Sequence, residues 1–327
     1  MFHRLFAALV AAAFVVMGTA GMANAKTTLK MATLAPPRSP WGVVFKTWAK
    51  AIKQKTKGET EVDWLWNGTG GPEDAVVGKI KSGQIAGSAL TAVGLSAIDK
   101  RFLALQMPGA FSSWKDLDRA RDKYGPELSK AAAKDGFEIL GWGDIGQGKV
   151  LSKGSTIAVP ADLKGKRPGA IAGDIIAPKV YEAIGGITSV SSSVVGFTSK
   201  LNAKAINVMN TPSLAAEQLQ WAPLLDHITT GTTYYGIGAV VMSKKELDKM
   251  PADQRAVVVD TGKLAAKALT KRIRKADDKA FGRLKKKMTV HETTKAEEAE
   301  WKRVFKKACE RLKGAIPGGA LSKVGAC

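Results

Sequence analysis

The segment 251–288 restricts the fold of this 327-residue chain more than any other, because it is long and contains almost no helix breaker. Its inward-facing residues recur at helical spacing. They are Val257, Thr261, Leu264, Ala268, Ile273, Phe281, Leu284 and Met288. A continuous helix of this length extends on the order of 55 Å, which exceeds the width of one lobe of such a chain. We therefore expect two lobes crossed by one helix, unless Gly262 or Gly282 divides that helix.

The N-terminal part of the chain alternates strand and helix patterns. The expected elements are a strand at 28–34, a helix opened by Ser39 and Pro40, a strand at 60–66, a helix from Pro72 and a strand at 85–90. This alternation within about sixty residues is typical of a parallel, doubly wound α/β lobe.

A similar pattern returns in the middle of the chain. The expected elements are a helix at 172–185, a helix that residues 191–193 cap and that ends near Leu201, and a strand at 205–209. In each half a strand delivers a polar residue at its carboxyl end, Thr91 in the first half and Asn210 in the second. Ligands of open α/β sheets bind at these strand ends, so we expect both residues to form hydrogen bonds in a shared cleft.

The N-terminus has the features of a Sec signal peptide. Arg4 precedes an apolar run at 5–17, and Ala23-Asn24-Ala25 matches a cleavage site. We therefore expect an exported protein. The two cysteines, Cys309 and Cys327, lie in the last twenty residues, where they either form a disulfide or remain separate thiols.

These patterns divide the chain into five parts. We expect a signal peptide at 1–25, lobe I at 26–150 with 236–250 returning to it, lobe II at 151–235, the lobe-spanning helix at 251–290, and a C-terminal helix and tail at 291–327.

The net charge of +21 by itself suggests a nucleic acid or an anionic membrane as partner. However, the basic residues are spread along helices and concentrate between Lys263 and Lys287, without an aromatic platform among them. This distribution argues against nucleic-acid binding. It favours the solvated face of the long helix over a contact with a membrane surface or an acidic partner.

The sequence offers little for catalysis. After the signal peptide it contains only His227 and His291, and it shows no nucleophile elbow, metal-ligand cluster or phosphate loop. We expect a protein that is not an enzyme and that has no metal and no cofactor.

Five stretches resemble the solute-binding proteins of TRAP transporters. They are LAPPRSPW, WNGTGGPEDAVVGKIKSGQIAGSALTAVGL, ILGWGDIGQGKVLSK, VPADLKGKRPGAIAGD and VVMSKKELDKMPADQRAVV. The resemblance covers nearly the whole mature chain. It implies a two-lobed periplasmic-binding-protein fold, a monomer, and delivery of a small molecule to membrane permease subunits when the lobes close around it.

The chain departs from this family where most members carry an arginine that binds the carboxylate of the ligand. The pattern DLKGLKIRVPG, counted from Gly165, places Gly169 at the arginine position. Arg167 and Arg38 are possible replacement cations, although a surface position is the simpler interpretation of each. Gln147 lies where some members place a second basic contact. Asp174 either caps its helix or accepts a hydrogen bond from a polar or cationic ligand.

Aromatic and acidic residues complete the predicted site. Trp66 follows a strand, and Trp142 is flanked by two glycines, so each either packs between elements or faces the cleft. Glu73 fits a helix N-terminus better than a ligand contact. Of Tyr234 and Tyr235, we expect one to pack at the hinge and the other to reach the ligand.

Three functions remain open at this point. The first is the TRAP-type receptor. The second is a carrier or sensor of the same fold that hands an apolar or lipid-like ligand to a partner protein. The third is a cationic protein that acts by binding an acidic surface. The sequence does not identify the ligand.

Overall fold

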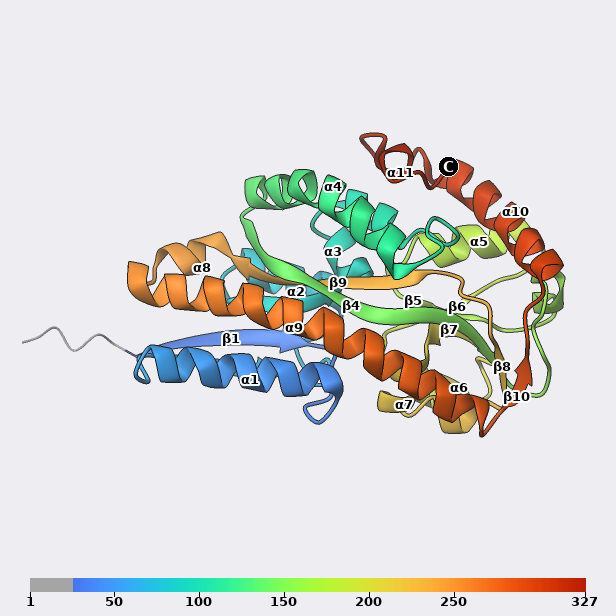
Figure 1. Cartoon of the computed structure of the whole chain (residues 1–327), viewed down its shortest axis with the longest axis horizontal. Coiled ribbons are helices and arrows are strands. Elements are labelled where there is room, and N and C mark those ends of the chain that lie inside the picture. Colours follow the sequence, from blue (N-terminus) through green and yellow to red (C-terminus); the bar gives the residue numbers. More distant parts are fainter. Residues whose placement is uncertain (1–25) are drawn as a thin grey trace, which may run out of the picture.

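The longest helix and the longest strand lie against each other and run through both lobes (Figure 1). They are α9 (Ala252–Lys285) and β4 (Phe137–Ser152). The structure, a computed structural model, describes residues 26–327, so the expected signal peptide lies outside the described residues. The predicted two-lobed α/β fold with one long crossing helix is confirmed, and neither Gly262 nor Gly282 divides α9.

The first lobe begins with the five alternating elements that the sequence predicts. They are β1 (Thr27–Thr33), α1 (Pro40–Lys55), β2 (Thr60–Leu65), α2 (Glu73–Lys81) and β3 (Gly87–Thr91). The Ser39 hydroxyl accepts a hydrogen bond from the Gly42 backbone N–H and so caps α1. Strand β1 pairs in parallel with β2 and β3, whereas β9 (Tyr235–Ser243) pairs antiparallel with β3 because the chain returns from the second lobe.

The second lobe differs in detail from the prediction. Helix α5 (Ile176–Ile184) begins four residues later than expected, because Gly173 adopts a φ of +86° in the preceding turn. Residues expected to cap a helix instead form β6 (Val190–Ser192), which pairs with β5 (Gly169–Ile171), and α6 (Phe197–Asn202) follows. The strand expected at 205–209 is β7 (Val208–Pro212), displaced by the turn at Lys204.

The remaining elements complete an eight-stranded sheet and its covering helices. They are α3 (Ala92–Ser96), η1 (Lys100–Gln106), α4 (Trp114–Lys134), η2 (Pro160–Leu163), α7 (Ser213–Gln218), η3 (Ala222–Leu224), β8 (His227–Thr229), α8 (Lys244–Asp248), β10 (Thr289–His291), α10 (Lys295–Leu312) and α11 (Ala320–Lys323). The sheet order is β10-β8-β4-β9-β3-β1-β2, and β7 also pairs with β4.

Glycines allow α9 to approach β4 closely. A Cβ atom on Gly141 would lie 2.5 Å from the Ala266 Cβ, and one on Gly262 would lie 2.8 Å from a Leu140 methyl group. Both contacts thus require a residue without a side chain. Gly262, which the sequence suggests as a break in the helix, is therefore a packing residue.

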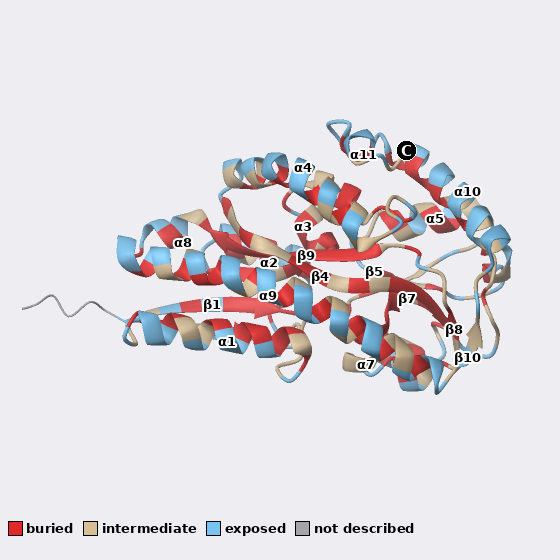
Figure 2. Ribbon diagram, in the orientation of Figure 1, coloured by how far each residue is buried: buried red, intermediate tan, exposed pale blue. Residues whose placement is uncertain are grey.

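Helices cover the sheet on both faces, and their buried residues face inward while their outer faces are exposed (Figure 2). Cys309 and Cys327 form a disulfide, which resolves the alternative that the sequence leaves open. In the described part of the chain, no helix is both long enough and apolar enough to cross a membrane.

Candidate functional site

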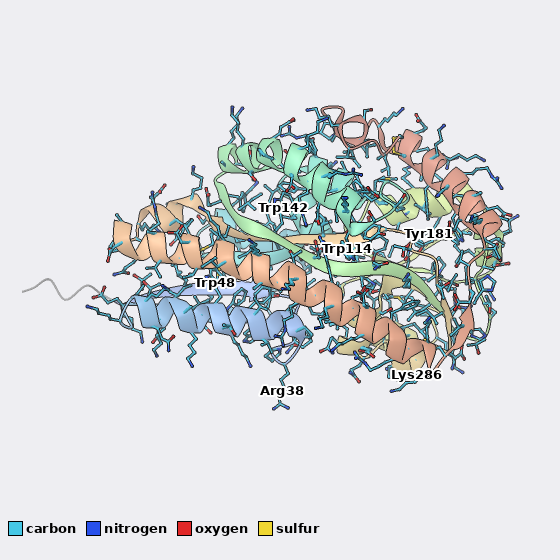
Figure 3. All side chains as sticks on the ribbon, in the orientation of Figure 1. Arg38, Trp48, Trp114, Trp142, Tyr181 and Lys286 are labelled. Carbon is cyan, nitrogen blue, oxygen red and sulfur yellow. A yellow bond between two sulfur atoms is a disulfide. The ribbon has the colours of Figure 1, made fainter. Side chains whose placement is uncertain are left out.

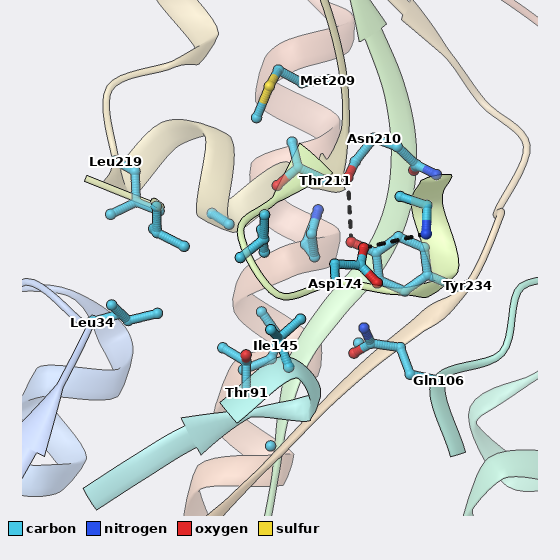
Figure 4. A pocket seen from close by; sticks show the side chains of 18 of the residues that line it. Leu34, Thr91, Gln106, Ile145, Asp174, Met209, Asn210, Thr211, Leu219 and Tyr234 are labelled. Atoms are coloured by element: carbon cyan, nitrogen blue, oxygen red, sulfur yellow. Dashed lines mark hydrogen bonds between the residues drawn. The ribbon is translucent and has the colours of Figure 1, made fainter. Parts of the chain in front are cut away.

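A cavity of about 210 Å³ lies between the two lobes. Leu34 and Thr91 line it from the first lobe, and Asp174, Met209 and Leu219 line it from the second (Figure 4). Most of its wall is apolar. A concave, mostly apolar space with a few polar groups is the usual form of a small-molecule site.

Four of the predicted site residues line this cavity. They are Thr91, Asp174, Asn210 and Tyr234. Thr91 ends β3 as predicted, whereas Asn210 lies in the middle of β7 because that strand runs to Pro212, yet both residues reach the same cavity.

Glu73 lies behind Thr91 and does not line this cavity. Its carboxylate accepts hydrogen bonds from the Thr91 backbone N–H at 2.7 Å and from the Thr91 hydroxyl at 2.5 Å. Burial raises the pKa of Glu73, and the hydrogen bonds from Thr91 oppose that rise. Glu73 therefore orients Thr91.

Asp174 occupies the N-terminus of α5. One carboxylate oxygen accepts a hydrogen bond from the Ile176 N–H at 2.7 Å, and the other accepts a longer one from the Ala177 N–H at 3.4 Å. This geometry confirms the capping interpretation. The same carboxylate also lines the cavity, and burial raises its pKa.

Two tyrosines lie beside Asp174. The Tyr234 hydroxyl is 3.4 Å from the Asn210 carbonyl oxygen, and the Tyr181 ring comes from α5. Both rings line the cavity, and burial raises the pKa of both phenols, with the Asp174 charge as the next cause. The Asn210 side chain is held by the Thr233 hydroxyl, which donates to its Oδ1 at 2.8 Å.

Trp142 lies outside the cavity. Its ring centroid is 5.8 Å from that of Phe102 in the first lobe. Gly141 and Gly143 face α9, where added Cβ atoms would meet Ala266 and Leu269. Because side chains alternate along a strand, Trp142 points the opposite way. The flanking glycines thus admit α9 and leave the tryptophan on the other face of β4.

Three further candidates are placed elsewhere. Trp66 packs on Trp64 with ring centroids 5.4 Å apart, and Tyr235 donates a hydrogen bond to the Ser112 carbonyl at 3.0 Å. The Gln147 side chain accepts a hydrogen bond from the Thr232 hydroxyl. None of the three lines the cavity. Of the two adjacent tyrosines, Tyr234 is the one that reaches it.

The possible replacement cations also lie away from the cavity. Arg38 is exposed and extends into solvent (Figure 3). Arg167 is exposed, and its Nε donates to the Lys204 carbonyl at 3.1 Å. Lys149, two residues after Gln147, donates a hydrogen bond to the Thr230 carbonyl. Its ammonium group lies 4.7 Å from the centre of the Phe281 ring.

Apolar side chains fill the space beside Gly169. A Cβ atom there would lie 2.9 Å from the Met209 Sδ, 3.0 Å from a Phe197 ring carbon and 3.2 Å from an Ile206 methyl group. Met209 and Phe197 also line the cavity. Gly169, which stands where most members of the family carry an arginine, is thus surrounded by apolar side chains.

Only two charged residues line the cavity in the part of the chain that the structure describes, Asp144 and Asp174. The Asp144 carboxylate is fully buried and accepts hydrogen bonds from Arg121 at 2.8 Å and Arg274 at 2.6 Å. Asp174 therefore carries the one lining charge without a cationic partner among residues 26–327.

Sequence reasoning missed Tyr181 and Gln106, which both line the cavity. Tyr181 follows Asp174 by seven residues within the helix that the sequence predicts at 172–185, and this spacing on one face of the predicted helix could have indicated it. Gln106 accepts a hydrogen bond from the Ile237 N–H at the end of η1, and no local pattern marks it.

Within residues 26–327, no group of three His, Cys, Asp or Glu residues is placed to hold a metal ion. Solved structures with this fold include a TRAP periplasmic solute-binding protein from Sulfurospirillum deleyianum with bound succinate. That protein is 19% identical, with a TM-score of 0.85 over 92% of this chain and 98% of the other. A sugar acid-binding protein from Advenella mimigardefordensis in complex with galactonate is 18% identical, with a TM-score of 0.85 over 91% of this chain and 97% of the other.

A curated solute-binding protein from Verminephrobacter eiseniae is 23% identical over 273 residues, which is 82% of this chain and 80% of that protein. The family model of the bacterial extracellular solute-binding proteins, family 7, matches residues 31–314. Because this match spans most of the chain, the chain belongs to the DctP family of extracellular solute-binding proteins.

Proposed function

We propose that this chain is the receptor of a TRAP-type transporter. After removal of residues 1–25 it would act in the periplasm as a monomer, with lobe I at 26–150 and 236–250 and lobe II at 151–235. It captures a small molecule between the lobes and passes it to a membrane permease. The observation that carries the proposal is the cavity between the lobes, to which both contribute polar strand residues, Thr91 of β3 and Asn210 of β7.

The proposed ligand contacts are the predicted residues that reach the cavity, Thr91, Asp174, Asn210 and Tyr234. Ligand binding at such a cleft draws two lobes together, and this closure is the change that a permease can recognise. Catalysis is not part of the proposal, because the family to which the chain belongs is one of solute receptors and not of enzymes.

Small-angle X-ray scattering tests this function directly. A small-molecule extract from the producing cells should reduce the radius of gyration and raise the melting temperature. Leu34→Trp and Ala177→Trp, which fill the cavity from opposite lobes, should abolish both effects while each variant remains folded. An extract that binds without compaction, or that still compacts and stabilises both variants as it does the native protein, would contradict a closing receptor.

Placing at position 169 the arginine that most family members carry should not create a binding site for a carboxylate ligand. We expect Gly169→Arg to lower the free energy of unfolding by about 1–3 kcal/mol, because its Cβ overlaps Met209 and Phe197. Succinate should still not stabilise the variant. Urea denaturation and thermal shift measure the two effects, with exposed Arg167→Ala as the control that changes neither. Tight succinate binding by a fully stable Gly169→Arg variant would contradict this prediction, because it would show that Met209 and Phe197 move aside for the arginine.

A second candidate is a carrier of the same fold that hands an apolar molecule to a partner protein without a permease. The apolar wall of the cavity favours it. Native mass spectrometry of the protein purified from its own compartment distinguishes the two, because a retained lipid supports the carrier and a readily exchanged small metabolite supports the transporter receptor.

A further inference from the structure

The cleft offers an anionic ligand none of the groups that usually bind one. Among the described residues that line it there is no lysine, arginine or histidine. Asp144 forms ion pairs with Arg121 and Arg274. Among the described lining residues, Asp174 is therefore the one acid whose charge no basic side chain balances. A carboxylate ligand would be desolvated beside a like charge, which is costly in a partly buried site.

Three helix N-termini near the cavity, those of α3, α5 and α7, are each occupied by a carboxylate of the chain itself. Asp174 accepts from the first N–H groups of α5, and Glu73 accepts from the Thr91 N–H at the start of α3. Asp277 accepts from the Leu214 N–H of α7 at 2.8 Å. A free helix N-terminus attracts anions, but here side chains have already taken these positions.

The surroundings of Asp174 suit a cation instead. Tyr181 and Tyr234 place two aromatic rings beside the carboxylate, and the Asn210 carbonyl lies within 3.4 Å of the Tyr234 hydroxyl. An ammonium group is stabilised both by a carboxylate and by the faces of aromatic rings. The Asp174 carboxylate accepts one backbone hydrogen bond on each oxygen, so its remaining lone pairs can accept from a ligand.

The rest of the cavity suits an apolar group. Met209 and Phe197 fill the position beside Gly169, and Leu34, Leu219 and Val194 line the wall with them. A ligand that satisfies both parts has a positively charged end and an apolar body.

Resting on the receptor function proposed above, we propose that the ligand is a small organic amine with an apolar body and no carboxylate. Its protonated nitrogen lies against Asp174 between Tyr181 and Tyr234, and its body lies against Met209 and Phe197.

Three probes of matched shape test this ligand class on the full mature protein: 2-phenylethylamine, 2-phenylethanol and 3-phenylpropionate. Titration calorimetry at pH 8 should show the amine binding about tenfold or more tightly than the carboxylate, with the alcohol between them. Equal or tighter binding of the carboxylate, or no binding of the amine, would overturn the proposal without any variant being needed.

Asp174→Asn removes the charge but keeps an oxygen that can accept from the Ile176 N–H. It should weaken amine binding by about tenfold or more and leave the alcohol unchanged. Asp63→Asn, an exposed change of the same charge on β2, is the matched control and should have no effect. An amine preference that survives in Asp174→Asn contradicts the assigned contact.

Scattering measured with the same probes separates this inference from the receptor function. Lobe closure around 3-phenylpropionate, and not around the amine, would refute the proposed ligand class but would still support the receptor function. Failure of every probe and of the cell extract to close the lobes would refute the receptor function, and the ligand class with it.

Discussion

Asp144→Ala should lower the free energy of unfolding by about 3–5 kcal/mol, because it leaves a buried positive charge without its partner. The Asp144 side chain is fully buried, and its oxygens accept from the Arg121 Nη1 at 2.8 Å and the Arg274 Nε at 2.6 Å. Asp118 also binds both arginines, so two acids balance two guanidinium groups in the native protein. Removal of Asp144 leaves a net charge of one in this cluster.

Urea denaturation followed by circular dichroism measures this loss. Arg119→Ala is the matched control, because Arg119 forms an exposed ion pair with Asp116 on the same helix as Arg121. Such a surface pair contributes about 0–1 kcal/mol. If Asp144→Ala cost no more than the control, the cluster would be solvated in solution and would not hold α4, β4 and α9 together.

Asp277→Ala should cost about 2–5 kcal/mol, because it deprives two buried backbone N–H groups of their acceptors. The Asp277 side chain accepts from the Gln147 N–H of β4 and the Leu214 N–H of α7, both at 2.8 Å. It therefore joins α9 to both elements where they cross between the lobes. Asp278→Ala, at the exposed neighbouring position, should change stability little and is the control.

Asp277 also predicts a pH dependence. Burial raises its pKa from 3.8 to about 6, so the folded state binds its proton more strongly than the unfolded chain does. The resulting stabilisation is complete below pH 3.8 and is lost as the pH rises through about 6. Between pH 4.5 and 8, the stability of the native protein relative to Asp277→Asn should fall by about 1–2 kcal/mol. A difference that stays constant over this range would mean that Asp277 titrates normally.

The alternation of strands and helices could be predicted because it depends on local periodicity. The bounds of β1 and β2 agree with the predicted ranges to within one residue, and α1 begins at Pro40 as predicted. Strand β4 could not be predicted in the same way, because the glycines at 141, 143, 146 and 148 resemble turn residues. The first three permit contact with α9, more than a hundred residues later, and no local pattern contains that information.

The site could be predicted only in part for the same reason. Thr91 and Asn210 follow from the rule that strand ends meet at a cleft. The orientation of Trp142 depends on α9, and the position of Asp174 relative to Tyr234 depends on the chain returning from the second lobe. The absence of an arginine at Gly169 was readable from the sequence, but the apolar wall that replaces it required Phe197 and Met209 to be placed in space.

The packing of α9 on α1 has a consequence for biogenesis. The Trp48 indole N–H donates to the Thr261 hydroxyl, and the Thr60 hydroxyl donates to the Gln254 side chain, across 213 and 194 positions. If the chain crosses a membrane from its N-terminus, as the expected signal peptide implies, part of the apolar face of α1, with Trp41, Phe45 and Trp48, stays uncovered until α9 has emerged. During that interval the nascent protein is a natural client for a holdase chaperone, and the second lobe is completed later still, when β10 pairs with β8 and α10 packs on α5.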